Sequence, residues 1–436
     1  MSVRHAALTA FCAALLTACG AAAPASVAPV PTTTTAPHAA PSRVEAAAAI
    51  PPAPQIIDGA APAAPAERLR TPDRVIPHPA GTVCVPDGDL AADPAGTLQR
   101  LMTGQYGPVG DWLLSDLGGA VNIGGPNQWW FALGDTFTGS NDGTRMPAGG
   151  ARFIHNAALI QDHNCFWVHT GRTPTGRTAS FIPDQADGSY YWPQGSYSAG
   201  DRLYTFAVQV RPTGGTGMFA FEPFDIDLAI TDLNNLTAPP TIVDAGPWEQ
   251  IDSRRLENIT TVDTGDGSIA VAFQYGSDTR NLGVARIADP SNPTSGWTVW
   301  DGTGWTGNLS NSVPVHIAKP GDSAAGRPVF HSGHWYLMTW RWLPSGETGY
   351  QVYTADSLTG PYSETGRSVA LWPYGQTASD HQYGHTLYGA YPALNGNMLM
   401  VWSNNAGFNA GILLARSRPT FTTFNPIALT ADAPAV

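Results

Sequence analysis

Two aspartates on either side of a short predicted hairpin have the types and spacing for acid–base chemistry. Asp116 lies in Ser-Asp-Leu-Gly and Asp135 in Leu-Gly-Asp-Thr-Phe, and the turn at 124–127 separates them. Counting outward from that turn places them directly opposite each other, where Cβ atoms are roughly 4.5–5.5 Å apart and like charges destabilise the pair. Such a pair favours one protonated and one ionised carboxyl, the division that glycoside hydrolysis requires.

We predict that Asp116 is the base or nucleophile and that Asp135 is the acid, and the chemistry requires no cofactor. Two structural alternatives remain open. Each aspartate could close its own turn through a backbone hydrogen bond. A structural Ca²⁺ would also explain two neighbouring acids, although no set of metal ligands is defined by the sequence. The motifs of serine hydrolases, P-loop proteins and HExxH metalloproteases are missing, so the sequence does not support these chemistries.

Seven further side chains are expected around the same site and could bind substrate. Five of them also have a plain structural explanation: a turn for the asparagine at 156, an ion pair for the glutamate, and packing for the tryptophan, the histidine and the tyrosine. The seven are Asn156, Trp192, Gln194, Glu257, Asn258, His385 and Tyr388. In contrast, four other tryptophans are assigned to the core: Trp129, Trp130, Trp335 and Trp340.

These residues need a scaffold that joins distant segments, and the composition indicates an all-β one. The 436 residues include 47 Gly and 38 Pro, only 13% are charged, and long helical periodicity is absent. Five segments share one plan, in which a polar opening leads through a turn to a very apolar strand. The openings are Asp116–Gly118, Trp192–Gln194, Glu257–Asn258, Ser312–Val313 and Tyr388–Gly389. This repeat predicts a five-bladed β-propeller; a large β-sandwich or two jelly rolls is the alternative.

The charge balance restricts the partners. A net charge of −12, from 22 basic and 34 acidic residues, argues against binding nucleic acid or anionic lipid headgroups. Fourteen Trp and fourteen Tyr beside acidic side chains suit a neutral ring-shaped ligand such as a sugar. We therefore expect a polysaccharide as the partner and a monomeric protein.

The first 72 residues have the composition of an export and tethering segment. Residues 1–18 resemble a lipoprotein signal peptide, in which a short apolar run ends just before Cys19. Cys19 is the predicted lipidation site; an ordinary signal peptide with an incidental cysteine is the alternative. The Ala/Pro/Thr-rich residues 19–72 are predicted to be a disordered linker, and residues 73–436 the propeller. The only contact with the membrane would be the lipid, on the outer face of the cell membrane.

Two cysteines remain for the exported domain. With Cys12 and Cys19 in the signal region, Cys84 and Cys165 are predicted to form a disulfide, which an oxidising compartment permits.

Several motifs resemble one family. Ser115–Gly118 followed by Leu133–Phe137 is similar to the opening blade of actinobacterial secreted proteins first classified as a domain of unknown function. Some of these are endo-D-arabinanases that act on mycobacterial arabinogalactan and lipoarabinomannan. Further similarity lies in Tyr191–Pro193, Leu282–Arg286, Gly360–Tyr362 and Tyr388–Pro392, so that it covers roughly residues 110–416.

The resemblance implies a five-bladed propeller and a glycoside hydrolase of D-arabinan, with the two motif aspartates as the catalytic pair. The chain differs at Val121–Ile123, where relatives often carry another acid. A non-catalytic propeller that binds a glycan or a protein at the cell envelope is the alternative function. Another pentose or fructose glycosidase is a third option.

Overall fold

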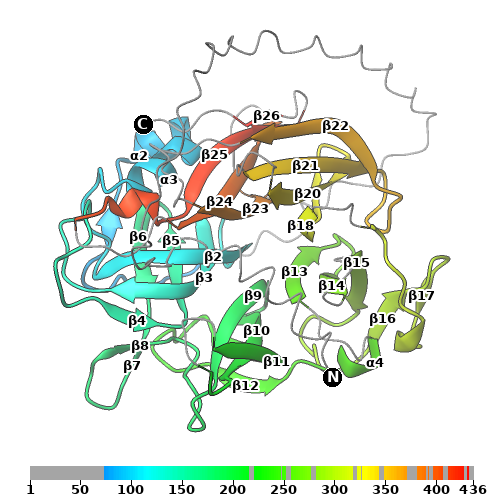
Figure 1. Ribbon diagram of the computed structural model, residues 1–436, viewed down its shortest axis with the longest axis horizontal. Helices are drawn as coiled ribbons and strands as arrows, with labels where there is room; N and C mark the ends of the chain where they lie inside the picture. Colours follow the sequence, from blue (N-terminus) through cyan, green and yellow to red (C-terminus); the bar gives the residue numbers. More distant parts are fainter. Residues whose placement is uncertain are drawn as a thin grey trace, which may run out of the picture.

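The computed structural model is all-β and forms a five-bladed propeller. It describes residues 73–215, 220–246, 248–251, 257–275, 281–317, 322–325, 327–342, 348–370, 381–388, 391, 396–405, 411–426 and 430–431. Five antiparallel sheets surround one axis, with the first strand in sequence of blades 2 to 5, and β2 of blade 1, nearest the centre (Figure 1). The predicted fold class is therefore confirmed. The predicted signal peptide, Cys19 and the predicted linker lie outside the described residues.

The first two blades and the elements around them come from the amino-terminal half of the chain. Blade 1 runs outward as β2 (Trp112–Asn122), β3 (Gln128–Thr138), β5 (Ala157–Asp162), β6 (Cys165–His169) and β1 (Val83–Cys84), with β4 (Arg152–Ile154) also paired to β3. Blade 2 is β9 (Tyr190–Ala199), β10 (Arg202–Pro212), β11 (Phe221–Asp232) and β12 (Thr241–Asp244). Between them lies the small ribbon of β7 (Gly171–Arg172) and β8 (Thr178–Ala179).

The other three blades follow in order. Blade 3 is β13 (Glu257–Asp263), β14 (Ile269–Tyr275), β15 (Asn281–Ile287), β16 (Trp297–Trp300) and β17 (Trp305–Thr306). Blade 4 is β18 (Asp322–Ala325), β20 (His334–Trp342), β21 (Thr348–Ala355) and β22 (Ser363–Ala370), with β19 (Val329–His331) beside β20. Blade 5 is β23 (His381–Tyr388), β24 (Met398–Asn405), β25 (Thr420–Asn425) and β26 (Thr430–Ala431).

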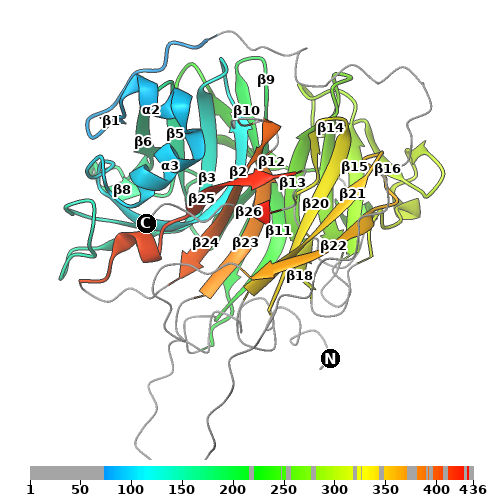
Figure 2. The ribbon, with the colours of Figure 1, turned by 90° about the horizontal axis from the view of Figure 1, so that it is seen from above.

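Short helical segments decorate this ring of sheets. Helices α2 (Asp87–Ala92) and α3 (Pro94–Met102) lie beside blade 1, and α3 contacts β25 (Figure 2). The remaining segments are α4 (Trp248–Ile251), η2 (Leu309–Asn311) and η4 (Leu414–Arg416). In the described part of the chain, no helix has both the length and the hydropathy to span a membrane.

Two of the five predicted blade openings are misplaced. Ser312 and Val313 were expected to open blade 4, but Val313 N–H donates to the carbonyl of Trp300, so this segment closes blade 3. The inner strand of blade 4 is β18, whose Asp322 to Ala325 is a weakly apolar sequence. Tyr388 ends the inner strand of blade 5 rather than beginning it.

Apolar side chains fill the space between each pair of neighbouring blades. Five clusters of buried residues lie between blades 1 and 2, 2 and 3, 3 and 4, 4 and 5, and 5 and 1. The four tryptophans assigned to the core are all buried: Trp129, Trp130, Trp335 and Trp340. Every blade is thus covered on both faces, which explains the continuous apolar runs in the second strands.

A buried arginine closes the ring between blades 5 and 1. The Arg418 guanidinium donates to the carbonyls of Leu113 at 2.6 Å, of Met102 and Gly143 at 3.1 Å, and of Trp112 at 3.2 Å. It also lies over the Trp112 ring, 4.6 Å from the centroid. Burial lowers the pKa of Arg418 to about 9, which still leaves it charged at neutral pH. One side chain from the carboxyl-terminal region therefore satisfies four buried acceptors near the start of the domain.

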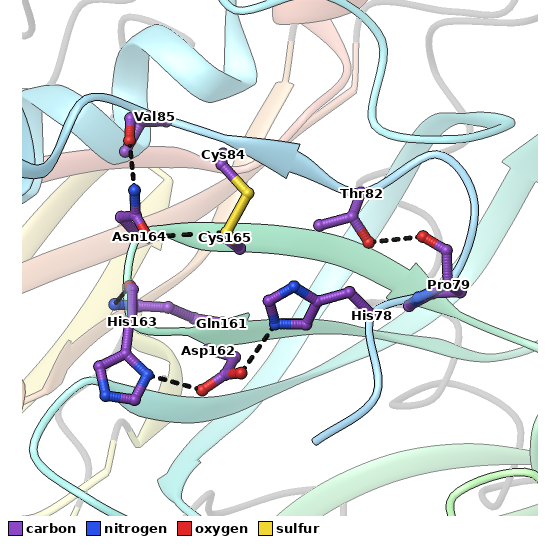
Figure 3. Close-up of a disulfide and its surroundings, with 10 residues drawn as sticks. All are labelled: His78, Pro79, Thr82, Cys84, Val85, Gln161, Asp162, His163, Asn164 and Cys165. Atoms are coloured by element: carbon purple, nitrogen blue, oxygen red, sulfur yellow. Dashed lines mark hydrogen bonds and ion pairs between the residues drawn. A yellow bond between two sulfur atoms is a disulfide. The ribbon is translucent and has the colours of Figure 1, made fainter. Parts of the chain in front are cut away.

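The predicted disulfide is confirmed. Cys84 and Cys165 are joined and occupy directly opposed positions on β1 and β6 (Figure 3). Nearby, His78 Nε2 and His163 Nδ1 lie 2.7 and 2.8 Å from the two carboxylate oxygens of Asp162 (Figure 3). These contacts fasten the beginning of the described chain to the outer part of blade 1.

Candidate active site

The predicted register of the β2–β3 hairpin holds on both sides of the two aspartates and is interrupted at them. Ala120 pairs with Phe131 and Ser115 with Thr136, as counting from the turn predicts. Between these pairs Leu117 faces Leu133, so Gly134 and Asp135 together oppose Asp116. The expected direct pair is replaced by a β-bulge on β3, in which two residues face one.

The Asp116 side chain begins close to the glycine of this bulge. A Cβ on Gly134 would come 3.5 Å from the Cβ of Asp116, so the Asp116 side chain lies against this stretch of β3. A second bulge on β2, at Gly118 and Gly119, faces Ala132 and restores the register. A third shift lies between the Trp112–Thr138 and Leu114–Phe137 pairs, so two of the three register shifts of this hairpin lie next to the two carboxylates.

A bulge on the innermost strand, like that at Gly118 and Gly119, occurs in all five blades. In the described ladders, the innermost strand of each blade carries one extra residue relative to its neighbour. Gln194 belongs to the extra pair in blade 2, Asn258 to that in blade 3 and His385 to that in blade 5. Bulges re-aim side chains and occur beside functional sites. Among the described ladders between first and second strands, the opposed bulge at Asp135 is a feature of blade 1 alone.

Close approach of the inner strands explains the glycines in these bulges. A Cβ on Gly119 would come 3.0 Å from the carbonyl oxygen of Gln194, and one on Gly195 only 2.7 Å from the Cα of Thr260. Backbones of blades 1, 2 and 3 therefore touch near the axis, and side chains there would separate them.

Asp135 has the properties of a proton donor. It keeps some contact with solvent, yet it is surrounded by protein. Burial first, and the Asp116 charge second, raise the pKa of Asp135 from 3.8 to about 7. A hydrogen bond from Trp192 and the nearby His155 oppose this rise. At neutral pH a large share of Asp135 thus remains protonated.

Trp192 determines which oxygen carries the proton. Its indole Nε1–H donates to Asp135 Oδ1 at 2.8 Å. Because an indole N–H can only donate, and a carbonyl oxygen accepts better than a hydroxyl oxygen, this hydrogen bond favours Oδ1 as the unprotonated oxygen of a neutral Asp135. The proton is therefore held on Oδ2.

Trp192 also has a particular place in the propeller repeat. It precedes the bulge of β9 by the same two residues by which Asp116 precedes the bulge of β2. The indole is half-buried and meets Phe221 edge-on, with 5.1 Å between ring centroids. The tryptophan expected near the site is thus in contact with one of the two carboxylates.

Side chains from blades 4 and 5 fix the strand that carries Asp116. Ser403 Oγ accepts the Leu117 N–H at 3.0 Å, the Tyr388 hydroxyl donates to the Gly118 carbonyl at 2.7 Å, and Arg327 Nη1 donates to the Ala120 carbonyl at 2.8 Å. Arg327 is half-buried, and desolvation lowers its pKa. Blades 4 and 5 thus hold the strand that carries Asp116, whereas blade 2 holds the Asp135 side chain through Trp192.

Two predicted substrate-binding residues are used internally. The Asn156 amide donates to the carbonyls of Ile182 and Tyr191 at 3.1 and 3.0 Å and accepts the Ile182 N–H at 2.8 Å, and the side chain is fully buried. Tyr388 is also buried, with its hydroxyl on the Gly118 carbonyl. The structural explanation is favoured for both of these residues.

Gln194 is the one remaining predicted residue whose side chain is described. Gln194 is half-buried on β9 next to Trp192. Glu257, Asn258 and His385 lie on the inner strands β13 and β23, but their side chains are outside the described residues. Within the described residues, no group of three His, Cys, Asp or Glu side chains is arranged to hold a metal ion.

Sequence reasoning missed His155 and Asp184. His155 Nδ1 lies 3.1 Å from Asp184 Oδ1, and its charge acts on Asp135. The available signal was the register of β3 with the strand that follows it, which places His155 opposite Asp135.

Sequence comparison decides the family. The model of a family described as a domain of unknown function, DUF5005, matches residues 105–423. The chain belongs to the DUF5005 family. This match spans all five blades and includes both aspartates. No curated protein matches this DUF5005 chain.

Solved structures support the architecture of this DUF5005 protein. A candidate hydrolase from Bacteroides ovatus is 16% identical, with a TM-score of 0.54 over 74% of this chain and 88% of that one. An α-L-arabinofuranosidase from Podospora anserina has a TM-score of 0.39 at 10% identity, over 72% of this chain and 89% of that one. A xylan β-1,4-xylosidase from Bacillus halodurans has 0.41 at 10% identity, over 73% and 54%. The first similarity supports the fold, and the other two are too low to support an inference.

Proposed function

We propose that this chain is a glycoside hydrolase that uses Asp135 as the acid and Asp116 as the nucleophile or base. The observation that carries the proposal is the burial of Asp135 beside Asp116, because burial first and the Asp116 charge second raise the pKa of Asp135 to about 7. A fold gains no stability from opposing two acids, so their placement where two opposed bulges meet points to chemistry.

Each carboxyl has a defined task in this reaction. Asp135 Oδ2 delivers its proton to the glycosidic oxygen as the bond from the anomeric carbon to that oxygen breaks. Asp116 either attacks the anomeric carbon or removes a proton from the water that attacks it. In the first case the carboxyls of the bound state are about 5–5.5 Å apart, and in the second about 6.5–9.5 Å. Trp192 stabilises the Asp135 carboxylate that forms when the proton leaves.

The proposed substrate is cell-envelope polysaccharide, with endo-acting cleavage of D-arabinan in arabinogalactan and lipoarabinomannan. Three features support it: the motif resemblance, the acidic and aromatic-rich composition, and the predicted signal peptide of residues 1–18 that precedes Cys19. Lipidation of Cys19 would hold the enzyme on the outer face of the membrane, where such polymers lie. The enzyme would act as a monomer and without a cofactor.

Release of oligosaccharides tests this function. The purified protein is incubated with mycobacterial arabinogalactan and, separately, with plant arabinan, which is built from L-arabinose, and the products are separated by chromatography. We expect products from the first polymer, and losses of at least about 100-fold in Asp116→Asn and Asp135→Asn, the scale of acid–base catalysis. Asp266→Asn, in the turn between β13 and β14 of blade 3, is the control and should retain full activity.

Two results would overturn the proposal. Unchanged turnover in either active-site variant would show that its carboxyl is not catalytic. Binding of the polymer without any release of products would indicate the alternative, a propeller that only recognises glycans.

A further inference from the structure

His155 lies directly opposite Asp135 on the outward side of β3. Leu133 pairs with Ala157 on β5, and Thr136 pairs with Ile154 on β4, so the register passes unchanged through the gap between them. This continuity places His155 across from Asp135, whereas the bulge affects only the side that faces β2. The effect of the His155 charge on the pKa of Asp135 agrees with this position.

The His155 ring is held in one orientation. Asp184 Oδ1 lies 3.1 Å from its Nδ1, and Ser180 Oγ both donates to Asp184 Oδ1 at 3.0 Å and accepts the His155 N–H at 3.1 Å. Because Nδ1 pairs with Asp184, Nε2 is the ring nitrogen that can bind another group. The His155 side chain is 24% exposed, so part of the imidazole is open to an external ligand.

Aromatic rings extend the surface around His155. Tyr190 stacks flat on the imidazole, with 3.7 Å between centroids and 11° between planes. Phe153 meets the imidazole edge-on at 5.1 Å and is 44% exposed, which is unusual for so large an apolar side chain in the described residues. Tyr190 also touches Trp192, the partner of Asp135, at 5.9 Å. We call Phe153, His155, Tyr190 and Asp184 the histidine shelf.

We propose that the histidine shelf binds the sugar of the leaving group in the glycan that Asp135 protonates. This inference rests on the proposed function. The exposed phenyl ring of Phe153 can pack against the C–H surface of a sugar ring. His155 Nε2 and the half-exposed Asp184 can form hydrogen bonds with the sugar hydroxyls. The shelf flanks Asp135 on the side away from Asp116. A sugar bound there is joined through the oxygen that receives the proton, so it leaves with the product.

Variants of the shelf test this assignment. Phe153→Ala, His155→Ala and Asp184→Asn are compared with wild type on arabinan oligosaccharides and on an arabinoside with a small activated aryl leaving group. We expect kcat/KM on the oligosaccharides to fall about tenfold or more for His155→Ala, which corresponds to the loss of one good contact. The aryl glycoside should lose much less activity than the oligosaccharides, because it has no sugar to place on the shelf and its activated leaving group depends little on the acid. Oligosaccharide binding, measured by calorimetry in the Asp116→Asn background, should weaken by the same factor.

A matched control separates binding from folding. His334, the first residue of β20 in blade 4, forms a similar pair with Asp356, at 3.3 Å, so His334→Ala should change neither kinetics nor binding. Equal losses on both substrates, or unchanged oligosaccharide binding in all three shelf variants, would overturn the inference while hydrolysis by wild type persists. If wild type binds oligosaccharides but hydrolyses nothing, the proposed function and the leaving-group assignment both fail. Weaker binding in the shelf variants would then still identify a saccharide site.

Discussion

Replacing Asp135 with asparagine should make the protein more stable at neutral pH. Asparagine has nearly the same shape, and its Oδ1 can accept the Trp192 hydrogen bond, but it carries no charge. It therefore removes the cost of holding an ionisable group beside Asp116 in a poorly solvated place. The catalytic pair would thus be a site where function is kept at the expense of stability.

The size of this gain follows from the raised pKa. In the unfolded chain Asp135 ionises near 3.8, whereas in the folded protein it ionises near 7. Between these values the unfolded state releases a proton that the folded state retains, so the wild type loses stability as pH rises, by about 1.4 kcal/mol per pH unit. The loss is complete above a pH of about 7. Because Asp135 keeps some solvent contact, we expect Asp135→Asn to gain about 2–4 kcal/mol at pH 8 and little at pH 4.

Urea unfolding at a series of pH values measures this gain. The free energy of unfolding of Asp135→Asn minus that of wild type should rise from pH 4 to 7 and then level off. Asp266→Asn is a control of opposite sign, because hydrogen bonds from Ser268 and Thr264 and the charge of Arg286 overcome desolvation and lower the pKa of Asp266 to about 2. That group stabilises the folded state above its unfolded pKa and loses the effect only as pH falls, so Asp266→Asn should destabilise at pH 7.

A difference that stays constant with pH would refute this reasoning. It would mean that Asp135 titrates alike in the folded and unfolded chains. A destabilised Asp135→Asn at pH 8 would also contradict it, since the carboxylate would then be favourable where it lies.

Three further changes test the scaffold, each by the midpoint of chemical unfolding. Arg418→Met should cost about 3–5 kcal/mol because four buried carbonyls lose their donor, and a loss under 1 kcal/mol would contradict the closure described for blades 5 and 1. Replacing Cys84 and Cys165 together by serine should cost about 2–5 kcal/mol, and reductant should reproduce the effect in wild type but not in the variant. Gly195→Ala should cost about 1–3 kcal/mol because its Cβ would meet the Thr260 backbone; an unchanged midpoint would show that the inner strands can separate freely.

The sequence predicted what depends on local patterns. The apolar second strands, the turn at 124–127 and the register near it follow from composition and hairpin rules, and so does the pairing of Cys84 with Cys165 once the other cysteines are assigned. The misplaced opening of blade 4 has a physical cause. Its inner strand, β18, has the sequence Asp-Ser-Ala-Ala, which lacks the β-branched and aromatic residues that mark a strand.

Features that join distant parts of the chain were not predictable in the same way. Nothing near Arg418 indicates that its guanidinium would reach carbonyls more than 270 residues earlier in the chain. The hydrogen bond from Trp192 to Asp135 depends on how blade 2 packs against blade 1. The periodicity of the sequence does not determine that packing. His155 could have been predicted from the sequence, because continuing the register of β3 to the next strand places this residue opposite Asp135.

The pH dependence of oligosaccharide release from arabinogalactan tests the central claim most directly, namely that one of two coupled aspartates acts as the acid. We predict a bell-shaped profile of kcat/KM whose alkaline limb falls with a pKa near 7, the value for Asp135. Activity that stays constant well above pH 7, or an absence of products at every pH in protein that is folded, would contradict the account.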